Sequence, residues 1–165
     1  KNIRMRIILA KTGEIKEGYA DWDDKVIRIK EKWVLGDPSI IIHEMIHQLQ
    51  FSLCGGSAYM RSDFERNIEF EAYLIMDISM AEAWLKQGMI PDASKLHFLY
   101  GVDDTVLVMD YINFLCRVYE RTISKEEFVS EFNRFAEKFE AYLGAEYSPS
   151  GTPSLIFSLW PFVWY

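Results

Sequence analysis

Residues 43–47 read His-Glu-Met-Ile-His, and this spacing constrains the chain more than any other feature of its sequence. On an α-helix, residues four apart lie one turn along and about 40° around the axis, so both imidazoles project from one face. A tetrahedral Zn²⁺ ion, which binds imidazole nitrogens at ~2.0–2.1 Å, suits such a pair. The spacing therefore predicts a metal-binding helix with His43 and His47 as ligands.

The glutamate of the motif is placed for a different task. Glu44 is offset from His43 by about 100° around the helix, so its carboxylate can reach a water molecule at the ion without binding the ion. This is the position of a general base, and we predict Glu44 as the catalytic residue. The competing interpretation is a helix whose two histidines face solvent or are satisfied inside the protein.

Signals on both sides of the motif predict a helix over residues 37–54. Asp37 is a good N-cap, Pro38 suits the first helical position, and Gly55 and Gly56 favour termination. An apolar stripe is expected to bury the side of this helix opposite the histidines; it comprises Ile42, Met45, Ile46, Leu49 and Leu53.

The first 35 residues have the alternation of short strands. We expect strands near 3–7, 15–19 and 25–30, with a polar turn at 21–24. The strand Val26–Ile29 could hold an extended peptide along its edge. Because strands come first and helices follow, we predict an α+β fold with a small, mostly antiparallel N-terminal sheet.

The remainder of the chain is expected to be helical, within a single domain over residues 1–165. Capping residues and glycines predict helices over 62–88, around 93–100, over 105–121 and over 124–144. The phenylalanines at 128, 132, 135 and 139 recur at helical spacing and are predicted to be core residues.

The segment Glu69-Phe70-Glu71-Ala72-Tyr73 extends the pattern. With His43-Glu44-x-x-His47 it resembles the zincin metallopeptidases, specifically a minimal gluzincin pattern of H-E-x-x-H followed by E-x-E-A, over roughly residues 25–80. No third histidine follows His47, which excludes the metzincin pattern. The resemblance implies a zincin-like fold, bound zinc and peptidase activity, with Glu69 as third ligand. Glu71 is the alternative, since the two glutamates lie about 200° apart on a helix.

The chain departs from the family pattern at Tyr73, where the pattern has an aspartate that orients a ligating histidine. Tyr73 itself, Asp77 or a backbone carbonyl would have to replace it. A peptidase also needs a donor to the oxyanion that forms on the scissile carbonyl. Tyr73, His97 and Tyr100 are candidates for these supporting roles, and their spacing does not select among them.

Composition narrows the possible partners. A formal net charge of -7 disfavours nucleic acid as a partner, and no apolar run approaches the ~20 residues of a membrane span.

Cys54 and Cys116 could be free thiols or could form one disulfide bridge. The apolar C-terminal tail, within residues 145–165, could complete the core, cover the metal cleft or mediate self-association.

Three functional hypotheses follow. The first is a zinc-dependent peptidase that acts on a peptide or protein substrate. The second is a non-proteolytic, metal-binding zincin-like scaffold, whose cleft is occluded by its own tail and which acts in recognition or regulation. The third is a helical interaction protein with a fortuitous motif, which predicts no stoichiometric zinc. No feature of the sequence indicates a compartment.

Overall fold

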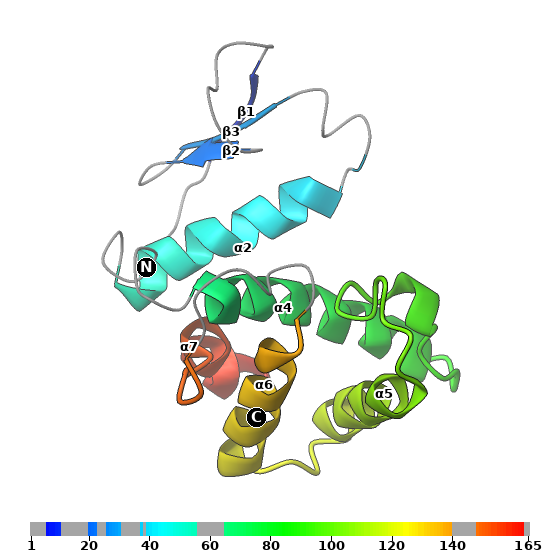
Figure 1. Cartoon of the computed structure of the whole chain (residues 1–165). Helices are drawn as coiled ribbons and strands as arrows, with labels where there is room; N and C mark the ends of the chain where they lie inside the picture. The colour runs from blue at the N-terminus through cyan, green and yellow to red at the C-terminus, as the bar shows by residue number, and fades with distance from the viewer. Residues whose placement is uncertain are drawn as a thin grey trace. The chain divides into compact units, whose positions relative to one another are not determined.

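The computed structural model describes residues 6–10, 20–22, 26–30, 37, 39–55, 65–139 and 148–163. Contacts along the chain divide it into two compact units, Lys1–Met60 and Arg61–Tyr165, which are described here one at a time (Figure 1). The expected single domain over residues 1–165 stays a prediction.

The first unit contains a small mixed sheet. Its strands are β1 (Arg6–Ala10), β2 (Ala20–Trp22) and β3 (Val26–Lys30), in the order β1-β3-β2 (Figure 1). β1 runs parallel to β3, pairing Arg6 with Val26 at one end and Ala10 with Lys30 at the other. β2 runs antiparallel to β3. In β3, Ile27 and Ile29 are fully buried, whereas Arg28 and Lys30 are only partly so, as its alternation predicted.

The predicted α+β class with a mostly antiparallel sheet is wrong. The longer strand pairing is parallel, and helices account for most of the described chain. Alternation in a sequence identifies a strand, but it does not specify the strand's partner or direction, which depend on contacts between distant segments.

Two further strand predictions need correction. Asp21 and Trp22, expected in a turn, lie in β2 and pair with Arg28 and Ile27. Since β3 lies between β1 and β2, neither of its edges is open to an incoming peptide. The predicted strand at 15–19, and residues 3–5 of the first predicted strand, lie outside the described residues.

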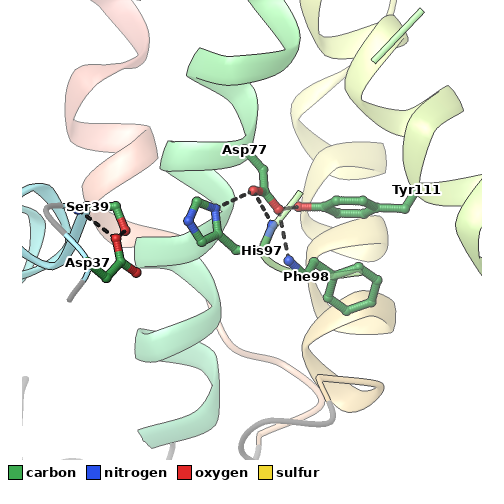
Figure 2. A network of polar contacts seen from close by, with 6 residues as sticks. All are labelled: Asp37, Ser39, Asp77, His97, Phe98 and Tyr111. Atoms are coloured by element: carbon green, nitrogen blue, oxygen red, sulfur yellow. Dashed lines mark hydrogen bonds and ion pairs between the residues drawn. The ribbon is translucent and has the colours of Figure 1, made fainter. Parts of the chain in front are cut away.

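The motif helix α2 spans Ser39–Cys54 and contacts β3. The Asp37 carboxylate accepts hydrogen bonds from the backbone N and the Oγ of Ser39, at 2.9 and 2.7 Å (Figure 2). Gly55, with φ of 126°, follows its last turn in a conformation that favours glycine. The predicted start and stop of this helix are confirmed to within two residues.

The second unit is helical. It consists of α4 (Glu65–Leu85), the 3₁₀ turn η1 (Ala93–Lys95), α5 (Thr105–Tyr119), α6 (Lys125–Glu137) and α7 (Ser154–Val163). α5, α6 and α7 all contact α4, the central helix of this unit (Figure 1).

Local capping explains most of these boundaries. The Asp104 carboxylate accepts from the backbone N of Val106 and Leu107, and Ser124 and Glu127 form the predicted capping box. The helix expected around 93–100 is instead a single 3₁₀ turn. α6 ends at Glu137, before the expected position 144; residues 140–147 and the predicted cap at Ser62 lie outside the described residues.

The core of the second unit is aromatic. The predicted row of phenylalanines is confirmed as core, since Phe128, Phe132, Phe135 and Phe139 are all at most 2% exposed. Phe70 of α4 packs against Phe132, with ring centroids 5.3 Å apart. Rings in such edge-to-face and tilted contacts add about 0.5–1.5 kcal/mol per pair beyond the area that they bury.

The C-terminal tail belongs to this core. Leu155 is fully buried and Ile156 is 7% exposed. The segment that leads into α7 is held by two asparagines: Asn67 exchanges hydrogen bonds with the backbone of Ser148, and Asn133 donates to the carbonyl of Gly151. A Cβ on Gly151 would lie 2.4 Å from Nδ2 of Asn67, so this close approach requires glycine. The prediction that the tail completes the core is confirmed for the first half of α7.

Candidate metal centre

The two histidines of α2 converge as their spacing predicted. His43 and His47 are 8% and 4% exposed, and their Nε2 atoms lie 2.9 Å apart. The rings meet edge to face, with centroids 4.4 Å apart and an interplanar angle of 87°. Two ring nitrogens therefore point at one location beside the helix.

The donor chemistry of this pair fits a zinc ion. Nitrogen ligands bound at ~2.0–2.1 Å in a tetrahedral site lie ~3.4 Å from one another. The observed separation of 2.9 Å between the Nε2 atoms comes within about 0.5 Å of that value.

The polar face of α2 is buried, whereas part of its apolar face is exposed. The buried residues include His43, Glu44, His47, Gln48 and Gln50. The predicted apolar stripe is wrong: Ile46 is its one buried member, and Ile42 and Leu53 are 55% and 38% exposed. Burying polar groups costs free energy unless they find partners. The burial of the polar face of α2 therefore favours a functional role for its residues.

Gln50 is a partner of the pair that the sequence analysis missed. Its side chain is fully buried, and its Oε1 lies 2.7 Å from Nδ1 of His47. An amide oxygen can only accept, so Nδ1 of His47 carries the proton and donates it. The spacing of three residues on one helix was the signal that could have revealed this contact.

Glu44, the predicted general base, is also buried, with 7% of its surface exposed. It lies on α2 next to His43, within the same buried polar face. A carboxylate largely shielded from bulk water interacts more strongly with nearby charges and dipoles than an exposed one does. Its role as general base stays a prediction.

The two candidate third ligands occupy different environments on α4. Glu71 is fully buried, and its Oε1 accepts hydrogen bonds from the backbone N of Leu155 and Ile156, at 2.8 and 3.0 Å. It therefore acts as an N-terminal cap of α7, where a negative charge is favourable. Glu69 is half-buried on the same helix.

Asp77 is the centre of a buried polar network in the second unit. Its carboxylate accepts from the backbone N of His97 at 2.7 Å and from His97 Nδ1 at 2.9 Å. It also accepts from the backbone N of Phe98 at 3.1 Å and from the hydroxyl of Tyr111 at 2.9 Å (Figure 2). Burial, with the Asp77 charge, raises the pKa of Tyr111 well above its usual value, so the phenol remains a donor.

The three predicted supporting residues differ in how firmly they are held. His97 is fixed by Asp77, and its side chain is 24% exposed. Tyr73 is half-buried, with its ring 5.5 Å from that of His97. Tyr100 is 87% exposed.

No disulfide joins Cys54 and Cys116. Burial and, secondarily, Glu120 raise the pKa of the Cys116 thiol, which therefore stays protonated at neutral pH. Among the described residues, no helix combines the length and the apolar character that crossing a bilayer requires.

Comparison of the chain with protein-family models, with curated proteins and with solved structures finds no match. The functional argument therefore depends on the residues themselves, above all on the histidine pair and its surroundings.

Proposed function

We propose that this protein is a zinc-dependent metallopeptidase of the gluzincin type. As the motif resemblance implies, His43, His47 and Glu69 would hold one Zn²⁺ ion. The observation that carries the proposal is the pair of buried imidazoles, whose Nε2 atoms approach to 2.9 Å. The capping of α7 by Glu71 supports Glu69 as third ligand, because the Glu71 carboxylate already serves two backbone N–H groups.

The chemistry of the chain's own residues follows from this assignment. A bound zinc ion would act as a Lewis acid and lower the pKa of a coordinated water to about 7. The Glu44 carboxylate would take the proton from the attacking water and deliver it to the nitrogen of the leaving amine. The peptide C–N bond breaks and a C–O bond forms, yielding a carboxylic acid and an amine.

Purified protein should contain about one zinc ion per chain. His43→Ala should lose most of this zinc, because the ion would lose one of three protein ligands. Metal content, measured by inductively coupled plasma mass spectrometry without chelator during purification, checks this expectation. His97→Ala is the matched control, since it removes the histidine outside the motif. Wild-type protein that binds no zinc, or a His43→Ala protein that keeps it fully, would contradict the proposal.

Within the proposal, His97 is the oxyanion donor. Its Nδ1 donates to the Asp77 carboxylate at 2.9 Å, which holds the ring in one orientation. Tyr100 is 87% exposed, so its side chain is held less firmly than that of His97. A donor must be positioned before the reaction, because only preorganised groups stabilise developing charge without further cost.

His97→Gln should lower kcat by about 10²–10³-fold, the usual effect of removing one oxyanion donor. Zinc content and the midpoint of unfolding should change little, because the backbone N–H groups of residues 97 and 98 still bond to Asp77. Hydrolysis of a quenched fluorescent peptide library measures the first quantity. Unchanged kcat would assign the donor to another residue, with Tyr73→Phe as the next variant.

A further inference from the structure

We propose that Gln50 is the positioning residue of the metal centre, holding His47 in the tautomer and orientation that expose its Nε2 atom to the ion. This inference rests on the proposed zinc site. It supplies a partner for a ligating histidine in a chain where Tyr73 stands in place of the aspartate of the gluzincin pattern.

The geometry around His47 carries the inference. Oε1 of Gln50 lies 2.7 Å from Nδ1 of His47, at the short end of the range for an N–H···O hydrogen bond. With the proton held on Nδ1, the lone pair of the neutral ring is on Nε2. Nε2 of His47 lies 2.9 Å from Nε2 of His43. Two ligands that share one ion must point their donor atoms toward each other in this way.

Because both side chains are buried, losing the hydrogen bond between Gln50 and His47 would have a large effect. Gln50 is fully buried and His47 is 4% exposed, so water does not readily replace the amide oxygen if that oxygen is removed. His47 would then have a poorly satisfied N–H, and the alternative tautomer, with its lone pair on Nδ1, would become competitive. Either change reduces the availability of Nε2.

The chemical character of Gln50 also tunes the site. A carboxylate that accepts from a ligating histidine raises the basicity of the imidazole and strengthens metal binding. A neutral amide gives the orientation without the charge. The chain's choice of glutamine therefore predicts a zinc site that is correctly oriented but weaker than one supported by a carboxylate.

The same helix offers a matched control. Gln48 is also fully buried on α2, but its Nε2 donates to Oγ of Ser52, at 3.3 Å, instead of contacting an imidazole. Gln48→Leu and Gln50→Leu each remove one buried side-chain amide, and the two positions lie two residues apart on α2. A purely structural role for buried amides predicts equal effects of the two changes, whereas a positioning role predicts that only Gln50→Leu affects metal binding.

The experiment measures zinc affinity by competition with a chromophoric chelator in wild type, Gln50→Leu, Gln50→Glu and Gln48→Leu. We expect about 10–100-fold weaker binding for Gln50→Leu, the usual effect of losing such a partner. Gln50→Glu should bind about tenfold more tightly, and Gln48→Leu should match wild type. Nitrogen-15 NMR of metal-free protein should show protonated Nδ1 in His47 of wild type and a mixture of tautomers in Gln50→Leu.

Each outcome has a clear meaning. If wild type binds zinc while Gln50→Leu binds equally well with the same His47 tautomer, the role of Gln50 is refuted and the proposed function stands. If wild type binds no zinc, both are refuted. Should Gln50→Leu fail to fold, Gln50→Glu decides, since binding no tighter than wild type would overturn the proposal.

Discussion

The Glu44→Gln protein should bind zinc as tightly as wild type and hydrolyse peptides about 10²–10⁴-fold more slowly. The substitution keeps the shape of a side chain that is 7% exposed, but it removes the group that accepts the proton of water. An amide cannot take up that proton at neutral pH. Zinc content should not change, because Glu44 is not among the proposed ligands.

Two measurements on the same sample test this expectation. Zinc content and hydrolysis of a quenched fluorescent peptide library are compared in wild type, Glu44→Gln and Glu120→Gln. Glu120 is an exposed carboxylate at the end of α5, so its substitution should leave both quantities unchanged. Full activity of Glu44→Gln would refute the proposed mechanism, and loss of zinc from it would place Glu44 among the ligands.

Truncation of the chain before Leu155 should unfold the second unit rather than activate the protein. Leu155 and Ile156 are buried in the core, and emptying a buried leucine or isoleucine site typically costs 2–5 kcal/mol. Glu71 would also lose the two N–H groups that its carboxylate binds, leaving a buried charge poorly satisfied. The combined loss exceeds about 5 kcal/mol, comparable to the whole stability of many small domains.

Urea unfolding followed by circular dichroism measures this effect. The substitution Ile156→Ala provides a milder comparison, which should remain folded with a free energy of unfolding about 2–4 kcal/mol lower. A truncated protein that stays folded and gains peptidase activity would contradict the expectation. That result would instead support the hypothesis of a tail that occludes the cleft of a regulated scaffold.

The local parts of the fold were predictable from the sequence because their causes are local. Asp37 caps α2 through a residue two positions away, and Ser124 and Glu127 cap α6 through each other. Such interactions join residues within one turn, so they can be recognised before any tertiary contact is known. The convergence of His43 and His47 follows likewise, since a helix brings positions four apart to one face.

The direction of strand pairing and the roles of buried carboxylates required the tertiary structure. Nothing in the sequence of β1 or β3 indicates that they pair in parallel, and nothing near Glu71 indicates that it caps a helix more than eighty residues away. The sequence alone determined the caps of α2 and α6, the aromatic core row and the paired imidazoles, because short-range geometry produces them. Only the tertiary structure decided that α2 buries its polar face, Gln50 included, because burial depends on what packs against a helix.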